Sequence, residues 1–357
     1  MRSQRRARTM AAAATLAGVL LGTTGCGGGG SAAQSTSTRA TTTTISTVPP
    51  TTTTTLPALV GVGTLAVGVR NDTYVDPSRP TPANGGAPGA PNRSMLTTVW
   101  YPASGPPSGA ATPGAAPDLT HGRYPLVVFA HGFAVTPRTY TSLLTQWASA
   151  GYVVVAPAIP LLNGDAPGGA SHTDYGAANI ADLDFVLADA LRRAATPGDP
   201  LAGLIDGNRV AITGHSDGEV LAYALALEPC CHDSRVKATI MMAGNLANAN
   251  AAPAATGVPA LHIMNDHDQF DPYTASIAYD RQTLPAPKKL LTLVNAPHLP
   301  PYSQPSDPHF DLVVHATVDF LDATLKAHPE AVSALQTLVT GSPSLAMLES
   351  TPAPSPP

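Results

Sequence analysis

The sequence has few charged residues and no excess of basic ones, and this shortage removes several classes of protein. Charged residues make up 12% of the 357 positions, and the formal net charge is −5. A chain with a small acidic excess has no basic surface for nucleic acid or for anionic lipid headgroups, so we expect no nucleic-acid partner. Such a low proportion of charged residues is consistent with an exported protein rich in alanine and proline.

Cysteine is also scarce, and the three that occur predict neither a metal site nor a cysteine nucleophile. Cys26 stands near the N-terminus, whereas Cys230 and Cys231 are neighbours, a spacing that matches no metal-ligand pattern. An oxidising compartment would favour a disulfide, but adjacent cysteines pair only through a strained ring. Two alternatives therefore stay open for this pair: two free thiols or a vicinal disulfide.

The N-terminal apolar run is too short to span a bilayer comfortably, and its flanks predict a secretory signal. Four arginines lie within residues 1–8, the apolar run covers 10–21, and small residues lead up to Cys26. This end resembles a bacterial lipobox, in which the cysteine is acylated, although Thr23 stands where leucine is usual. We expect residues 1–26 to be a signal peptide and Cys26 to anchor the protein to the outer face of the cell membrane. Secretion without an anchor is the alternative.

Composition divides the rest of the chain into three parts. Residues 27–57 are almost entirely Gly, Ser, Thr, Ala and Pro, which predicts a disordered tether. Residues 341–357 lose periodicity and end in proline, which predicts a flexible tail. Residues 58–340 have the length and composition of one α/β domain, which we expect to be a monomer.

Within that domain, strand-like and helix-like segments alternate. Alternation of apolar strands with helices predicts a mostly parallel central sheet with helices on both faces, where ligands bind beyond the carboxyl ends of the strands. The N-terminal segments 60–69 and 94–101 are predicted to pair as strands. Further strands are predicted over 124–130, 153–156, 210–213, 238–242, 259–264 and 289–294, and helices over 139–150, 177–193, 220–227 and 310–325.

The segment Gly214-His215-Ser216-Asp217-Gly218 lies between a predicted strand and a predicted helix. In that context a GxSxG pattern is a nucleophile elbow, a sharp turn that presents the serine hydroxyl and tolerates only small residues two positions away. The N–H groups at the start of the following helix point to the place where an oxyanion would form. The pattern therefore predicts that Ser216 is the nucleophile of a serine hydrolase.

A serine nucleophile needs a base and an acid. After a nucleophile elbow the acid comes first along the chain and the histidine base comes second. Among the late histidines, only His298 follows a predicted strand in a loop, whereas His309, His315 and His328 fall in or beside the last helix. We therefore expect His298 to be the base. The acid belongs in the loop after 259–264, where three aspartates compete. A calcium loop is excluded because its sixth position is not glycine and Ile277 stands where glutamate is needed.

Residues 126–325 resemble the α/β-hydrolase superfamily. The likeness is to its dienelactone-hydrolase-like and platelet-activating-factor-acetylhydrolase-like serine esterases, and also to cutinase-like polyester hydrolases. The motifs that carry it are His131-Gly132-Phe133, the segment 148–153, and the Trp-Tyr-Pro-Ala of residues 100–103. The resemblance implies that Asp268 is the acid, with Asp266 as its rival. It also implies that the backbone N–H groups of Phe133 and Asp217 form the oxyanion hole.

The resemblance implies an exported enzyme that cleaves small-molecule or polymeric carboxylic esters through an acyl-enzyme, without a metal or other cofactor. A polyester-, cutin- or lipid-directed hydrolase and a catalytically silent binding protein of the same fold are the alternatives. Glu219 departs from the glycine usual in these families, and we expect it to be tolerated near a helix N-terminus. The carboxylate of Asp217 is expected to disfavour anionic acyl groups.

Overall fold

The computed structural model describes residues 61–249 and 251–353. The expected signal peptide, the expected acylation site Cys26 and the expected tether 27–57 lie outside the described residues, as do the last four residues of the expected tail. None of the helices in the described ranges is both long and apolar enough to cross a membrane.

Ten strands of the described chain form one sheet, in the order β10-β9-β8-β7-β6-β4-β5-β2-β1-β3. The six strands from β5 to β9 in that order run parallel to one another, and β2 and β10 flank them antiparallel. The strands are β1 Ala66–Asp76, β2 Arg93–Ala103, β3 Ala111–Pro113, β4 Tyr124–Ala130, β5 Val153–Pro157, β6 Ile205–His215, β7 Val236–Met242, β8 Ala260–Asn265, β9 Lys288–Leu293 and β10 Ala346–Thr351.

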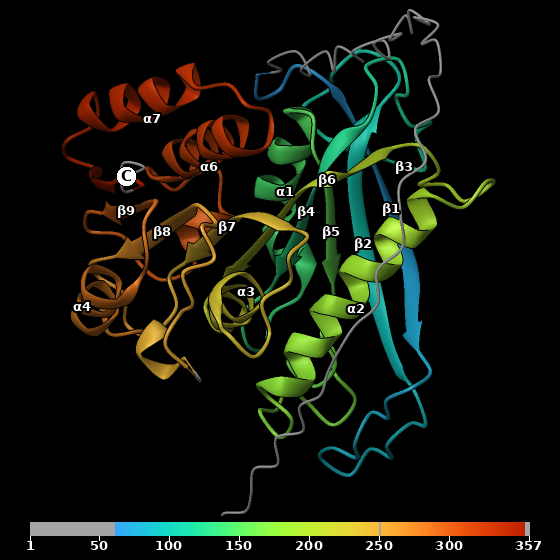
Figure 1. The fold of residues 1–357 in the computed structure, drawn as a ribbon. Helices are drawn as coiled ribbons and strands as arrows, with labels where there is room; N and C mark the ends of the chain where they lie inside the picture. Colours follow the sequence, from blue (N-terminus) through green and yellow to red (C-terminus); the bar gives the residue numbers. More distant parts are fainter. Residues whose placement is uncertain (1–60, 250, 354–357) are drawn as a thin grey trace, which may run out of the picture. The chain divides into compact units, whose positions relative to one another are not determined.

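Helices cover both faces of this sheet (Figure 1). Helices α2 and α3 pack on one face, and α1, α6 and α7 belong to the core on the other. The mixed α/β architecture with a mostly parallel sheet is the predicted one. The helices are α1 Thr141–Ser149, α2 Ala177–Ala194, α3 Asp217–Leu227, α4 Tyr273–Thr283, α5 Pro300–Ser303, α6 Phe310–Leu325 and α7 Glu330–Thr340, with single 3₁₀ turns at Pro137–Tyr140 and Leu246–Asn248.

The central strands are buried on both faces, which explains their composition. All seven residues of β4 and all five of β5 are buried, and both strands are continuous apolar runs. A parallel strand covered by helices on both sides has no solvent face, so polar and apolar residues do not alternate along it. Helix α3 is buried around nearly its whole circumference, as its apolar sequence requires.

The prediction of a flexible tail from residue 341 is wrong for most of its length. Residues Ala346–Thr351 form β10 and pair antiparallel with β9 at the sheet edge. Helix α7, which was not predicted, leads into this strand and buries Leu335 and Val339. Only one residue of β10, Ala346, is buried, so the strand depends on backbone pairing with β9 rather than on an apolar pattern.

The pair Cys230 and Cys231 forms a vicinal disulfide in the turn after α3. Of the two alternatives left open by the sequence, the structure therefore has the disulfide. Cys231 packs against the core that contains α2 and α3.

A buried cluster of charges ties β2 to α2 and to the loop that precedes α2. Arg93, at the start of β2, donates two hydrogen bonds to Asp182 of α2, at 2.6 and 2.5 Å. A third nitrogen of the same guanidinium donates to Asp174 in the loop at 2.6 Å. The side chain of Arg79 also reaches Asp182, at 2.8 Å. Because Arg93 and Asp182 are almost fully shielded from water, each depends on the other for compensation of its charge.

We expect Arg93→Met to lower the free energy of unfolding by about 3–5 kcal/mol, because it leaves buried carboxylates without their main partner. Urea unfolding followed by circular dichroism measures this as a lower midpoint at an unchanged slope. Arg138→Met is the matched control. The pair between Arg138 and Asp165 has the same 2.6 Å separation, but its side chains are 67% and 64% exposed. Its loss should cost under about 1 kcal/mol. Equal effects of the two changes would contradict the prediction.

Candidate active site

Ser216 occupies the sharp turn between β6 and α3, with φ 57° and ψ −126°. A non-glycine residue in this region of backbone space costs about 1–3 kcal/mol and persists only where its surroundings hold it. Two hydrogen bonds do so: the Ser216 N–H donates to Met242 O at 2.8 Å, and Ser216 O accepts from the Glu219 N–H at 2.8 Å. The turn leaves the serine side chain half-buried at the carboxyl edge of the sheet.

The two glycines of the elbow are required by close backbone contacts. A Cβ on Gly214 would lie 1.9 Å from Gly218 O, and a Cβ on Gly218 would lie 2.2 Å from Ala130 O. Neither contact can be relieved by turning a side chain, because both obstacles are main-chain atoms. A larger residue at Gly214 would therefore push α3 away from β6, and one at Gly218 would push α3 away from β4; either would move Ser216.

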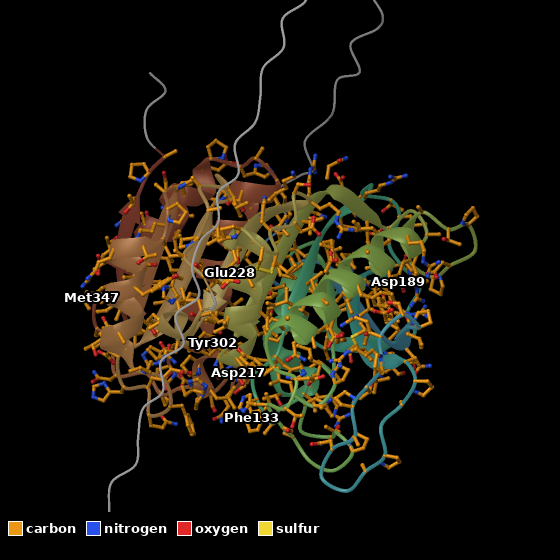
Figure 2. All side chains as sticks on the ribbon, turned by 60° about the horizontal axis from the view of Figure 1, so that its bottom comes forward. Phe133, Asp189, Asp217, Glu228, Tyr302 and Met347 are labelled. Carbon is orange, nitrogen blue, oxygen red and sulfur yellow. A yellow bond between two sulfur atoms is a disulfide. The ribbon has the colours of Figure 1, made fainter. Side chains whose placement is uncertain are left out.

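The loop after β4 passes beside Ser216 and carries Phe133. A Cβ on Gly132 would lie only 3.0 Å from Ser216 Cβ, so this loop passes directly beside the serine. Phe133 and Asp217 are neighbours at the same edge of the sheet (Figure 2). Neither of their backbone N–H groups donates to another described residue, and the Asp217 N–H is the first of helix α3. Both are therefore available to an oxygen bound beside Ser216.

His298 and Asp268 form a short pair at the ends of β9 and β8. The Nδ1–H of His298 donates to Asp268 Oδ2 at 2.6 Å, while no described residue binds His298 Nε2. Asp268 is held in turn by the N–H groups of Phe270 at 2.8 Å and Asp271 at 3.0 Å. Burial by itself would raise the pKa of Asp268, but the hydrogen bonds from His298, Asp271 and Phe270 outweigh it and lower the pKa below its ordinary value.

The rival acid Asp266 is turned to other partners. Its carboxylate accepts a hydrogen bond from the Asn295 N–H at 2.6 Å and one from His267 at 2.8 Å. The structure thus brings Asp268, and not Asp266, to the imidazole of His298. The third aspartate of the loop, Asp271, lies 3.9 Å from His298 Nδ1.

Asp271 is a carboxyl group with an unusual environment. Burial raises its pKa to about 7, with further increases from the charges of Glu219, Asp268 and Asp217, against the opposing effect of His298. Asp268, Asp271 and His298 also form one of two groups in the described chain whose ligand atoms lie within 4.8 Å of one another. A metal ion there would have to displace the bond between His298 and Asp268. The other group contains both disulfide-bonded cysteines.

Asn265 positions the His298 loop, a role that the sequence did not predict. Its Nδ2 donates to Pro297 O at 2.6 Å and to His298 O at 3.2 Å, and its Oδ1 accepts from Tyr302 Oη at 2.6 Å. Asn265 stands where the resembled families have glycine, and this departure was the available signal. His215 supports the same loop by donating from Nε2 to His298 O at 3.0 Å.

The histidines beside the elbow are structural. His131 and His215 are fully buried, and burial lowers their pKa values to about 4 and about 3, so both are neutral at physiological pH. Nε2 of His131 accepts a hydrogen bond from the Ile159 N–H at 2.9 Å. Nδ1 of His215 accepts one from Tyr140 Oη at 2.8 Å. Each ring therefore joins two loops rather than transferring protons.

Glu219 has a more specific environment than a helix N-terminus. It is fully buried, accepts a hydrogen bond from the Gly244 N–H at 2.7 Å, and faces His262 Nε2 at 3.2 Å. His262 in turn binds Asp280 at 3.0 Å, and Asp280 pairs with Lys288 at 3.0 Å. Burial by itself would lower the pKa of His262, but Glu219 and Asp280 raise it to about 9. Two negative and two positive groups therefore alternate behind the elbow and balance in charge.

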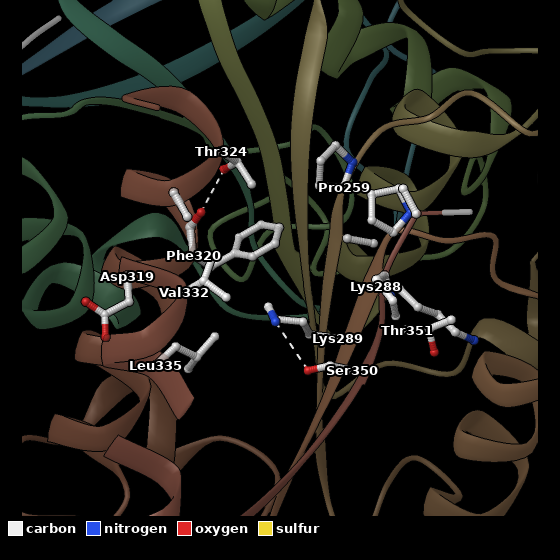
Figure 3. A pocket seen from close by; sticks show the side chains of 15 residues that line it. Pro259, Lys288, Lys289, Asp319, Phe320, Thr324, Val332, Leu335, Ser350 and Thr351 are labelled. Atoms are coloured by element: carbon white, nitrogen blue, oxygen red, sulfur yellow. Dashed lines mark hydrogen bonds between the residues drawn. The ribbon is translucent and has the colours of Figure 1, made fainter. Parts of the chain in front are cut away.

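An apolar cavity of about 480 Å³ elsewhere in the described chain does not belong to this site (Figure 3). It is bordered by Ala260 and Lys288, the first residues of β8 and β9, and by side chains of α6 and α7. Parallel strands all begin at one edge of the sheet and end at the other. The cavity therefore lies at the edge opposite to the one that carries Ser216.

The strand order, the elbow after β6 and the loops after β4, β8 and β9 define an α/β-hydrolase fold. The structure is similar to that of ferulic acid esterase from Streptomyces cinnamoneus, with a TM-score of 0.58 and 23% sequence identity. The match covers 74% of this chain and 91% of the esterase.

In sequence, residues 111–246 match the family model for chlorophyllase. The chain is also 33% identical over 106 residues to chlorophyllase-1 of Arabidopsis thaliana, which is 30% of this chain and 30% of the plant protein. The matched segment thus spans less than a third of the curated relative. Of these likenesses, the one to the solved structure covers most of the chain and agrees with the α/β-hydrolase fold.

We expect Asp268→Asn to lower kcat by about 10³-fold or more, because the amide cannot hold His298 in the correct tautomer or stabilise its protonated form. Asp266→Asn is the matched control, two residues away in the same loop, and should change kcat by less than about tenfold since its partners are Asn295 and His267. Steady-state hydrolysis of p-nitrophenyl acetate measures both. A larger loss in the Asp266 variant would show that Asp266 is the acid.

Proposed function

We propose that this protein is a serine esterase that cleaves carboxylic esters through an acyl-enzyme, with Ser216, His298 and Asp268 as its triad. The observation that carries the proposal is the 2.6 Å bond between His298 and Asp268, formed at the edge of the sheet at which β6 presents Ser216 on a strained elbow. The likenesses to chlorophyllase and to a ferulic acid esterase support the same reaction class.

In the first half of the reaction, Ser216 Oγ attacks the ester carbonyl carbon while His298 Nε2 takes the hydroxyl proton. The carbonyl oxygen becomes an oxyanion and accepts hydrogen bonds from the N–H groups of Phe133 and Asp217. Asp268 stabilises the imidazolium that forms. The bond to the alcohol oxygen then breaks, His298 returns the proton to that oxygen, and the acyl group remains on Ser216.

In the second half, a water molecule replaces the alcohol. His298 removes one proton from this water as its oxygen attacks the acyl carbon, and the same two N–H groups bind the second oxyanion. The bond to Ser216 Oγ breaks, the proton on His298 passes to the serine, and the carboxylic acid leaves.

Aromatic side chains beside the site favour esters with a large apolar or conjugated part. Phe133 is 38% exposed and Phe270 is 73% exposed, and the Phe270 ring lies 5.1 Å from that of His298. Exposed phenyl rings beside an active site can bury a flat substrate group against them. The names of the relatives suggest two such substrates, chlorophyll and feruloyl esters.

We also propose that the enzyme is exported and held on the outer face of the cell membrane by acylation of Cys26. The support is the basic start, the short apolar run and the small residues before this cysteine. The Gly-, Ser- and Thr-rich residues 27–57 would then separate the catalytic domain from the lipid surface.

We expect a fluorophosphonate probe to label wild-type protein at Ser216, and Ser216→Ala to abolish labelling and lower ester turnover by about 10⁴-fold or more. Ser333→Ala on the exposed face of α7 is the control and should retain both. A panel of p-nitrophenyl esters of increasing length, methyl ferulate, chlorophyll, a polyester film and matching amides identifies the substrate class. Persistent labelling in the Ser216 variant would refute the assignment, and binding of esters without turnover would indicate a silent binding protein.

For the anchor, we expect the wild-type protein produced in a bacterial host to partition into the detergent phase of a Triton X-114 extraction. Cys26→Ser should move it to the aqueous phase or leave the precursor uncleaved, without changing the specific activity of the folded domain. N-terminal sequencing of the wild-type protein provides the check. A mature N-terminus beyond Cys26 in a wholly soluble protein would rule out the anchor and leave the esterase assignment unaffected.

A further inference from the structure

His172 touches both residues whose N–H groups would bind the oxyanion. Its Nε2 lies 2.6 Å from Asp217 Oδ2, and its ring stacks on that of Phe133 with centroids 4.1 Å apart and planes inclined by 14°. Phe133 follows β4, whereas Asp217 follows β6, so the two are 84 positions apart in the chain and are joined here through a third residue.

A second aromatic residue of the same loop holds Asp217 from its main chain. The hydroxyl of Tyr175 donates to Asp217 O at 2.9 Å. The Tyr175 ring also meets the His172 ring edge to face, with centroids 5.2 Å apart. Asp217 is therefore restrained through its carboxylate and its carbonyl, while its N–H remains unoccupied by described residues.

The loop that carries these two residues, 158–176, is itself fixed to the fold. Asp174, which lies between His172 and Tyr175 in sequence, accepts a hydrogen bond from the buried guanidinium of Arg93 at 2.6 Å. Asn84, from outside the loop, donates from Nδ2 to Gly169 O at 2.6 Å, and within the loop the Ser171 N–H donates to Leu161 O at 2.7 Å. A loop secured at several points can impose a position on what it touches, unlike an isolated surface side chain.

From these contacts we propose that His172 is a positioning residue of the oxyanion hole, which keeps the N–H groups of Phe133 and Asp217 at a fixed separation. The inference rests on the proposed esterase function. Donors stabilise an oxyanion most when they are in place before it forms, because no reorganisation is then needed. The same hydrogen bond directs the Asp217 carboxylate toward the imidazole, so that its negative charge is not left free beside the forming oxyanion.

Two substitutions separate the contacts of His172. His172→Phe retains a ring to stack on Phe133 but cannot donate to Asp217, whereas His172→Gln retains a donor but not the ring. We expect His172→Phe to lower kcat by about tenfold or more with KM changed less than about twofold, since a displaced donor weakens only the transition state. We expect His172→Gln to recover part of the loss. Hydrolysis of p-nitrophenyl butyrate gives both constants.

A transition-state analogue distinguishes positioning from a general structural effect. Phenylboronic acid forms a tetrahedral adduct with an active-site serine, so its inhibition constant should rise by the same factor by which kcat falls. Asp217→Leu keeps the backbone N–H but removes the oxygen that accepts from His172. If His172 and Asp217 act through one contact, the double variant with His172→Phe should lose little more than the worse single variant.

His121→Phe is the matched control. The side chain of His121 is 54% exposed and that of His172 is 50% exposed, and each lies 2.6 Å from its aspartate partner, which is Asp118 for His121. His121, however, precedes β4 and lies at the opposite edge of the sheet. It should leave kcat and inhibition unchanged. The inference would be overturned if the His172→Phe variant had the same kcat as the wild type, or if its kcat fell while the inhibition constant of the boronic acid did not change. The proposed function fails separately, if fluorophosphonate does not label Ser216 in the wild type.

Discussion

The close main-chain packing around Ser216 is the constraint on which the rest of the site depends. The serine has a left-handed φ of 57°, and the glycines on either side of it lie so near to neighbouring carbonyl groups that a Cβ would not fit. This packing brings β4, β6 and α3 together at one point. Every other group of the candidate site is arranged around a serine whose position the backbone has already determined.

Loops from separate strands surround that point, and polar contacts hold the two that carry His298 and Asp268. Asn265 and His215 hold the loop of His298, and two backbone N–H groups hold Asp268. Behind the elbow, Glu219, whose N–H binds Ser216 O, faces the buried His262. Buried charges are costly unless they are paired, and here two acids alternate with two bases.

Much of the fold could be predicted from local sequence patterns, and the elements that were not predicted have a common cause. Helix α6 begins and ends where its apolar periodicity predicts, because one face is buried against the sheet. Strand β10 escaped prediction because it lies at an edge, with mostly exposed side chains, and is held by backbone hydrogen bonds to β9. Backbone pairing leaves little trace in composition, so a segment near proline-rich sequence appeared to be a tail.

The sequence by itself determined the alternation of strands and helices and the elbow around Ser216, since both depend on residues that are neighbours in the chain. Only the tertiary structure decided that Asp268 rather than Asp266 meets His298. The two aspartates are two positions apart in one loop, and which of them reaches His298 depends on where the neighbouring strand β9 ends. The same holds for His172 on Asp217, 45 positions away, and for the partner of Glu219. Contacts between distant residues require the folded backbone, and no local pattern encodes them.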